Sequence, residues 1–246
     1  SYTYYKGKLL EQYLTFFTLL QEARSKKVYP QAMIDSIRRM YGPFSLDSLQ
    51  YCKDVVTVDS AYLCNNIDWA FKVWQEQPWG KNVSFADFCE YILPYRIGDE
   101  TLSYWREDIY RKYNPLLDSL RASTVLDIED PLVAARCLCD SLRKRSRFFT
   151  TTVPQGLPHV GPEIAQSVSG SCRELSDYVV YVCRALGIPC AIDFIKSRFY
   201  LRAIFTVLLK TKLFCPKIEI KTQTTQSQKI QTFQLLLNSN PSQLWA

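Results

Sequence analysis

Apolar side chains recur at helical spacing along most of the first 150 residues. Over Ser60–Gln77, for example, Leu63, Ile67, Phe71 and Trp74 follow one another at intervals of three or four positions. That spacing places side chains on one face of an α-helix. The same pattern, bounded by turn and capping residues, predicts helices over residues 8–26, 31–40, 60–77, 84–94, 100–113, 115–122 and 131–147.

Two of these helices also carry start signals. Ser84 followed by Asp87 resembles a capping box, and Asp130 before Pro131 combines an N-cap with a proline at the first helical position. The amino-acid composition then changes over residues 148–161, which contain a run of threonines together with Pro154, Gly156 and other helix-breaking residues. We predict a loop there and a boundary near residue 150, so that residues 1–150 form a helical N-terminal region.

Residues 170–194 predict a helix followed by a buried strand. Ser171 and Glu174 fit a capping box, which puts Cys172 at the first helical position. An apolar face follows up to Leu186, Gly187 supplies the residue after the helix, and Pro189 prevents its continuation. Residues 190–194 then read as a strand.

The expected position of Cys172 suits a nucleophile. A thiol reacts as the thiolate, and the free N–H groups and partial positive charge at a helix N-terminus favour that form. The same N–H groups can hold the oxyanion that forms when sulfur attacks an amide carbonyl. Gly170 would leave room for a substrate backbone. The alternative interpretation is that Cys172 is an inert, buried cysteine.

This segment resembles the core of the transglutaminase-like superfamily, which has a papain-like thiol fold. The similarity lies in Gly-Ser-Cys-Arg-Glu at residues 170–174 and Arg-Ala-Leu-Gly-Ile-Pro-Cys at residues 184–190. The helical stretch upstream, around residues 66–106, is similar to transglutaminase-like proteins of Bacteroides-type bacteria. The resemblance implies an α+β fold, a helical block followed by a partial papain-like core over residues 151–195. It also implies a bacterial protein of the cell envelope.

The resemblance implies thiol chemistry on a peptide or amide carbonyl of a protein or peptide substrate, by hydrolysis or acyl transfer. Gln166, six residues before Cys172, is the candidate oxyanion-hole glutamine, and no cofactor is expected. The family also needs a histidine and then an acid after the cysteine. The only histidine is His159, which precedes Cys172, and no aspartate follows Asp193. We therefore expect impaired catalysis; a non-catalytic structural or binding protein is the alternative. His159 is expected to be a loop residue, with a rearranged catalytic role as the alternative.

Charge separates the last part of the chain from the rest. Residues 196–246 contain eight basic residues and one acid, a net charge of +7, whereas residues 1–195 contain 22 basic and 23 acidic residues, a net charge of −1. Glycine is absent after Gly187. We predict that residues 196–246, a basic tail, are not the native continuation of the core and do not complete its sheet.

The remaining candidates favour structure over function. Aromatic residues at helical spacing favour a core over a binding surface, although the tryptophans allow either; these are Trp69, Trp74, Trp79 and Trp105. A second group is interpreted as an internal ion-pair cluster or part of a substrate cleft; it comprises Glu90, Tyr95, Arg96, Trp105 and Arg106. We expect no metal site, no nucleic-acid binding and no transmembrane segment, because the chain lacks the corresponding motifs and any apolar run of about 18 residues.

Overall fold

The structure is a computed structural model, and most of the chain between residues 50 and 207 is described. The described residues are 2–4, 15–19, 22, 26, 35–36, 38–40, 42, 50–145, 149–150, 158–159, 161–166, 169–170, 172–196, 201–207 and 231–232.

The described part of the chain is mostly helical. Residues 15–19 and 38–40 are helical and fall within the first two predicted helices, whose remaining residues lie largely outside the described part. The elements up to residue 145 are β1 (Tyr2–Tyr4), β2 (Gln50–Cys52), α3 (Asp54–Thr57), α4 (Ser60–Glu76), η2 (Pro78–Asn82), α5 (Phe85–Asp87), η3 (Phe88–Ile92), α6 (Arg106–Tyr113), η4 (Asn114–Leu117), α7 (Asp118–Arg121) and α8 (Pro131–Arg145).

The predicted caps are present where they are described. The Ser84 hydroxyl accepts a hydrogen bond from the Asp87 amide at 3.1 Å, and the Asp130 carboxylate accepts one from the Leu132 amide at 2.8 Å. Asp59 caps α4 in the same way, accepting from Tyr62 at 2.7 Å. These bonds satisfy amides that the first helical turn leaves without a partner.

The predicted start of this helix at Glu100 is wrong, because α6 begins at Arg106. The side chain of Glu100 instead binds the backbone of a turn. Its carboxylate accepts hydrogen bonds from the amides of Ile97 at 2.5 Å and Gly98 at 2.8 Å. A buried carboxylate bound in this way stabilises the turn and cannot also open a helix.

The second part of the chain brings strands and helices together around one long helix. Its elements are β3 (Phe149–Thr150), α9 (Pro162–Ala165), β4 (Ser169–Gly170), α10 (Cys172–Ala185), β5 (Cys190–Lys196), β6 (Leu201–Val207) and β7 (Gln231–Thr232). Strands β3 and β4 pair in parallel, and β5, β6 and β7 form an antiparallel sheet in that order. Strands β1 and β2 form a separate antiparallel pair.

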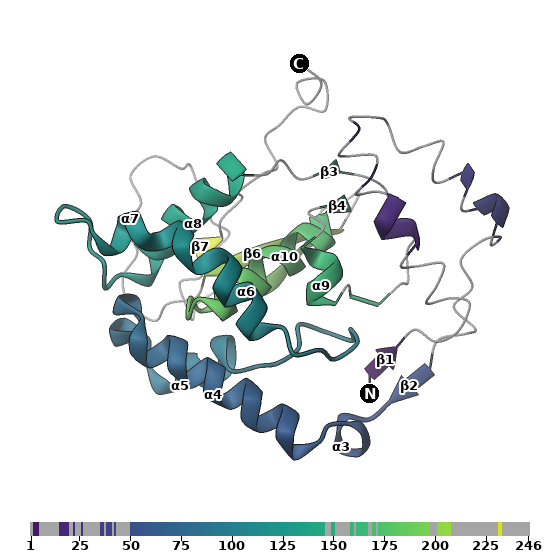
Figure 1. The fold of residues 1–246 in the computed structure, drawn as a ribbon, viewed down its shortest axis with the longest axis horizontal. Coiled ribbons are helices and arrows are strands. Elements are labelled where there is room, and N and C mark those ends of the chain that lie inside the picture. Colours follow the sequence, from purple (N-terminus) through teal and green to yellow (C-terminus); the bar gives the residue numbers. More distant parts are fainter. Residues whose placement is uncertain are drawn as a thin grey trace.

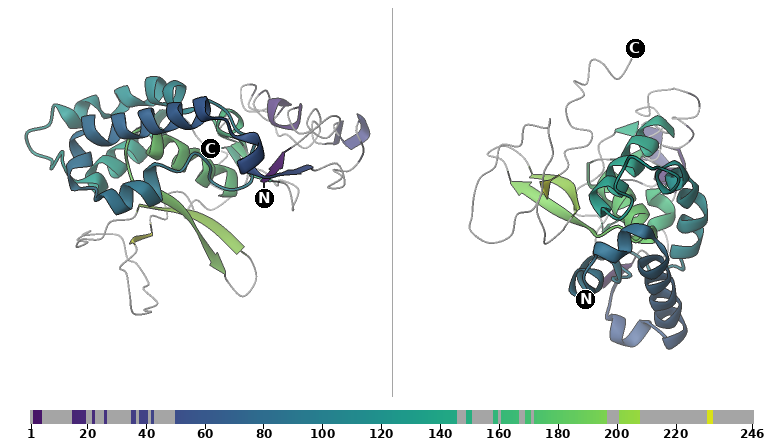
Figure 2. Two further views of the ribbon diagram at one scale, coloured as in Figure 1. Left: turned by 90° about the horizontal axis from the view of Figure 1, so that it is seen from below. Right: turned by 90° about the vertical axis from the view of Figure 1, so that its left-hand side faces the viewer.

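Helix α10 lies at the centre of the molecule (Figure 1) and packs against α4, α6, α9, β5 and β6. The sequence predicts one apolar face, but every residue from Ser176 to Cys190 is buried. Neighbouring elements surround this helix, and a helix in that position buries all its faces. The hairpin of β5 and β6 extends from one side of the helical block (Figure 2).

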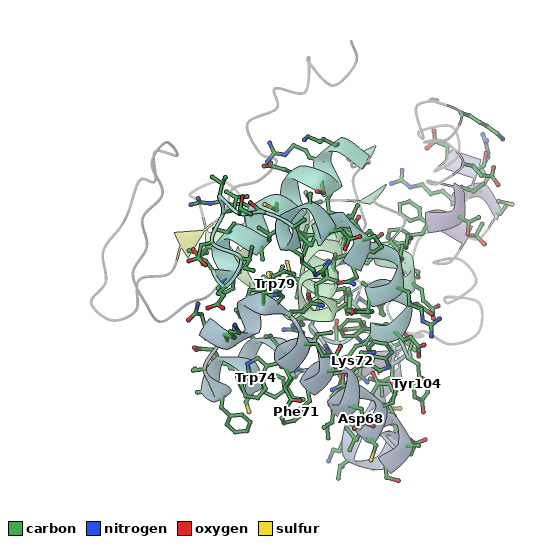
Figure 3. The ribbon with its side chains drawn as sticks, turned by 60° about the vertical axis from the view of Figure 1, so that its left-hand side comes forward. Asp68, Phe71, Lys72, Trp74, Trp79 and Tyr104 are labelled. Atoms are coloured by element: carbon green, nitrogen blue, oxygen red, sulfur yellow. The ribbon has the colours of Figure 1, made fainter. Side chains whose placement is uncertain are left out.

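The C-terminal end of α10 is fixed by a Schellman motif. Gly187 has a φ of +72°, and the Ile188 amide donates to the Cys183 carbonyl at 2.9 Å. The Trp79 indole N–H donates to the Leu186 carbonyl at 2.9 Å. Trp79 is fully buried, and Phe71 and Trp74 lie side by side on α4 (Figure 3). The helix therefore ends against the helical block before the chain turns into β5.

Strand β6 corrects one expectation for the basic tail. Leu201–Val207 pairs with β5 along its whole length, from Lys196 opposite Leu201 to Cys190 opposite Val207, and it contacts α10. The expectation that the tail does not complete the sheet is corrected for Leu201–Val207, which forms the strand next to β5. Apolar residues fall opposite one another in this register, for example Ile192 and Phe205, and such pairs stabilise a hairpin.

Candidate functional site at the start of helix α10

Cys172 is the first residue of α10, as the sequence predicts. The chain reaches it from β4, in which Gly170 pairs with Thr150 of β3. Ser171, the predicted cap, lies outside the described residues. The arrangement places Cys172 at the end of the helix where free amides and the helix dipole favour a negative charge.

His159 lies beside this helix, although it precedes it in the chain by more than ten residues. Its Nδ1 is 2.8 Å from Oδ1 of Asp177, which projects from the second turn of α10. The backbone N–H of His159 donates to the Asp99 carboxylate at 2.8 Å. Two acidic side chains from different parts of the chain therefore hold the histidine in place.

Asp177 is the functional candidate that sequence reasoning missed. Its side chain is fully buried, and Oδ2 has no hydrogen-bond partner among the described residues. A buried carboxylate without compensating contacts is costly, so such residues are usually paired. A signal was present in the sequence, because Asp177 stands directly before the apolar run of residues 178–183, five residues after Cys172.

Burial and pairing both change the protonation of these two groups. Burial raises the pKa of Asp177 to about 6, against the lowering effect of His159. Burial alone would lower the pKa of His159, but the hydrogen bond and the charge of Asp177 outweigh it and raise that pKa. The pair therefore holds protons near neutral pH more firmly than either isolated side chain would.

The turn at residues 97–100 covers the outer edge of the imidazole. A Cβ atom on Gly98 would lie 2.5 Å from Cδ2 and 3.0 Å from Nε2 of His159. The turn is tied to α10 because the Tyr181 hydroxyl donates to Glu100 at 2.6 Å. Only glycine leaves room for the ring at this position.

Gln166 follows α9, and its side-chain oxygen accepts a hydrogen bond from Lys112 of α6 at 2.8 Å. An oxyanion-hole glutamine acts through its amide N–H groups instead. The bond from Lys112 occupies the side-chain oxygen of Gln166 and not its amide N–H groups. It therefore does not test the oxyanion-hole role of Gln166, which stays a prediction.

In the second candidate group Trp105 and Arg106 are buried and Tyr95 and Arg96 are partly buried, and the ion pair that Arg96 makes is with Asp54, outside the group. Arg96 makes a two-pronged contact with Asp54 at 2.8 and 3.1 Å, and the Tyr95 hydroxyl donates to the same carboxylate at 2.6 Å. The exception is Glu90, which is exposed.

Arg106 is buried in the same region. Its guanidinium donates to the carbonyls of Ile92 at 2.6 Å and Arg184 at 3.3 Å, and to the side chain of Asn66 at 2.5 Å. Burial, and then the charge of Arg184, lowers the pKa of Arg106 to about 9. These bonds tie η3 to the end of α10 and leave the site at its start untouched.

Comparison of the chain with models of protein families, with curated proteins and with solved structures finds no match. Within the described ranges, no helix combines the length and apolar character needed to cross a membrane.

Proposed function

We propose that this chain is a transglutaminase-like thiol protein with an α+β fold, in which a helical block precedes a partial papain-like core. The observation that carries the proposal is the place of Cys172 as the first residue of α10. Support comes from the order of elements after it, a buried helix that ends at Ala185 and leads into the antiparallel strands β5 and β6.

The chemistry follows from that position. The Cys172 thiolate attacks the carbonyl carbon of a peptide or amide, and the amides of the first turn of α10 stabilise the oxyanion. Loss of the amine leaves an acyl-enzyme, and water or a second amine then accepts the acyl group. For a bacterial member of the family, hydrolysis of a peptide or amide is favoured over protein cross-linking, and the proposed location is the cell envelope.

Turnover is proposed to be impaired. The sequence after Cys172 contains no histidine, and its last aspartate is Asp193. A missing general acid slows departure of the amine, a step for which acid–base catalysis contributes about 10²–10⁴-fold. The same observation supports the second candidate, a non-catalytic structural or binding member of the family.

Brief treatment with iodoacetamide near neutral pH, followed by mass-spectrometric mapping, tests the proposal. Cys64 and Cys89 are exposed and serve as ordinary thiols for comparison. We expect Cys172 to be alkylated faster than both, because the helix terminus lowers its pKa below the usual value of about 8.5. The Cys172→Ala variant identifies the modified peptide.

Slower labelling of Cys172 than of the exposed thiols contradicts the proposal and indicates an inert cysteine. An amidase assay then separates the two candidates. Little or no turnover is expected, and robust activity that is lost in Cys172→Ala would contradict the impairment.

A further inference from the structure

Three buried thiols lie together where α10 leads into β5. Cys183 stands in the last turn of α10, Cys190 is the first residue of β5, and Cys139 belongs to α8. All three are buried in one hydrophobic core cluster. Cys139 also interacts electrostatically with the other two. Three different elements therefore bring their thiols to one place.

Within this group, Cys183 and Cys190 are hydrogen-bonded to one another through their thiols. The backbone between them is held in a fixed turn. The Ile188 amide donates to the Cys183 carbonyl at 2.9 Å, and Gly187 has the left-handed conformation that this turn requires. Cys190 is held on its other side, because it pairs with Val207 of β6.

Two interpretations apply to a buried thiol pair of this kind. Cysteine can fill a core as a small apolar residue. Two thiols held side by side also have a high effective concentration for forming a disulfide. The sulfurs must come within about 2.05 Å of one another, and rotation about the Cα–Cβ bonds moves them closer. The second interpretation is favoured here, because the connection of residues 184–189 is short and already ordered, so closing it costs little further chain entropy.

We propose that Cys183 and Cys190 form a reversible disulfide that links the end of α10 to the start of β5, with Cys139 left as a thiol. The oxidant is a low-molecular-weight disulfide. A thiolate of the pair attacks one sulfur of the oxidant and releases a small thiol, and the second cysteine then displaces the other small thiol. The two cysteines are oxidised and the small disulfide is reduced, so that one S–S bond replaces another and both protons leave on the small thiols. The inference goes beyond the proposed function and does not involve Cys172.

The surroundings of the pair predict slow exchange in the folded protein. The hydrogen bond to Cys190, and then burial, raise the pKa of Cys183 well above its ordinary value, so little thiolate is present near neutral pH. Both sulfurs are also closed to reagents while β5 stays packed on α10. The hairpin of β5 and β6 extends from one side of the helical block (Figure 2), and its opening exposes Cys190. We therefore expect the bond to form readily during folding and slowly afterwards.

Peptide mapping tests the proposal. Trypsin places the three cysteines in different peptides, which are residues 174–184 for Cys183, 185–196 for Cys190 and 137–143 for Cys139. The reduced, urea-unfolded protein is refolded in a buffer of oxidised and reduced glutathione, and free thiols are then blocked with N-ethylmaleimide. A sample kept in urea in the same buffer is the reference. The linked peptides of Cys183 and Cys190 are expected to be at least about tenfold more abundant after refolding, because the fold holds these thiols together.

Two variants identify the partners. In Cys139→Ala the linked pair should persist, whereas in Cys190→Ala the peptide of Cys183 should carry N-ethylmaleimide. Circular dichroism confirms that each sample is folded. If refolding does not restore the native spectrum, prolonged incubation of the native protein in the same buffer decides.

Several results overturn the inference. These are no enrichment over the unfolded reference, a link from Cys139 to either cysteine, a glutathione adduct that persists on either member of the pair, or a link found only in covalent dimers on a non-reducing gel. The Cys172 thiol is scored in a separate peptide, residues 148–173. Its reactivity and this disulfide therefore succeed or fail independently.

Discussion

At the scale of single residues, the pair of His159 and Asp177 shows where sequence reasoning stops. The position of Cys172 follows from local signals, namely a cap before it and a stop after its helix. The partnership of residues 18 positions apart depends on how a loop folds over α10, and no local signal encodes that. A buried acid predicts that a partner exists without saying which one.

The first prediction concerns the pH dependence of stability. Both folded-state pKa values are raised, that of Asp177 to about 6 by burial and that of His159 by its aspartate. The folded protein therefore binds these protons more tightly than the unfolded chain, and the stabilisation is complete at low pH. It is lost as pH rises through the folded pKa of Asp177 and then through that of His159.

Urea unfolding of wild type and of the double variant His159→Gln/Asp177→Asn, followed by circular dichroism, measures this effect. The free energy of unfolding of the wild type minus that of the double variant should fall as the pH rises from about 4 to about 8. A difference that grows with pH would show that the pair is charged and stabilising in the folded state at high pH, contrary to the prediction.

The second prediction concerns Gly187, whose φ is +72° and whose missing Cβ would lie 2.7 Å from the Val73 carbonyl oxygen. Gly187→Ala meets both backbone strain and a clash with α4, and should lower the free energy of unfolding by about 2–4 kcal/mol. Gly42 is the matched control, because its φ is +78° and nothing lies within 4 Å of its Cβ position. Gly42→Ala should cost about 1 kcal/mol. Equal costs would mean that the contact with α4 contributes nothing.

At the scale of elements, helices with caps were predicted well, and their neighbours less well. α5, α8 and α10 begin where their N-terminal signals place them, because capping is a local interaction. The late start of α6 was missed because the Glu100 carboxylate accepts hydrogen bonds from the amides of Ile97 and Gly98. These bonds depend on the burial of the whole turn. Tertiary contacts that satisfy a buried polar group override the helix propensity of the local sequence.

The third prediction concerns the junction of η2 with the end of α10. Trp79→Phe removes the indole N–H that donates to the Leu186 carbonyl. It should cost about 1–3 kcal/mol, because a buried carbonyl loses its partner. Trp74→Phe is the matched control. Trp74 donates to the Val83 carbonyl at 3.0 Å from a partly exposed position, where water can replace the indole. Chemical unfolding followed by circular dichroism compares the two variants. A larger loss for Trp74→Phe would contradict the role given to Trp79.

At the scale of the whole molecule, the sequence predicts a helical block that precedes the segment with Cys172, and the structure places α10 among α4, α6 and α9. Composition and periodicity were sufficient for the helical character. They could not show that α10 is surrounded, because that depends on which elements meet. The hairpin of β5 and β6 illustrates the same limit: composition separates residues 196–246 from the rest of the chain and does not show that Leu201–Val207 pairs with β5 along its whole length.

The last prediction concerns the origin of residues 196–246. Four changes coincide near residue 195: the net charge moves from −1 to +7, glycine ends at Gly187, aspartate ends at Asp193, and the histidine and acid expected from the family resemblance are absent together. One event, a frameshift, accounts for all four, whereas separate substitutions require several. Pairing of Leu201–Val207 with β5 does not oppose this, because an apolar segment rich in β-forming residues pairs with a neighbouring strand whatever its origin.

The coding DNA provides the test. Read in the other two frames, the region after codon 195 should encode a glycine-rich stretch that contains a histidine and then an aspartate. Such a stretch would supply the base and the orienting acid of the family after Cys172. If neither frame encodes it, a frameshift is excluded. The change in net charge near residue 195 would then belong to a truly divergent chain.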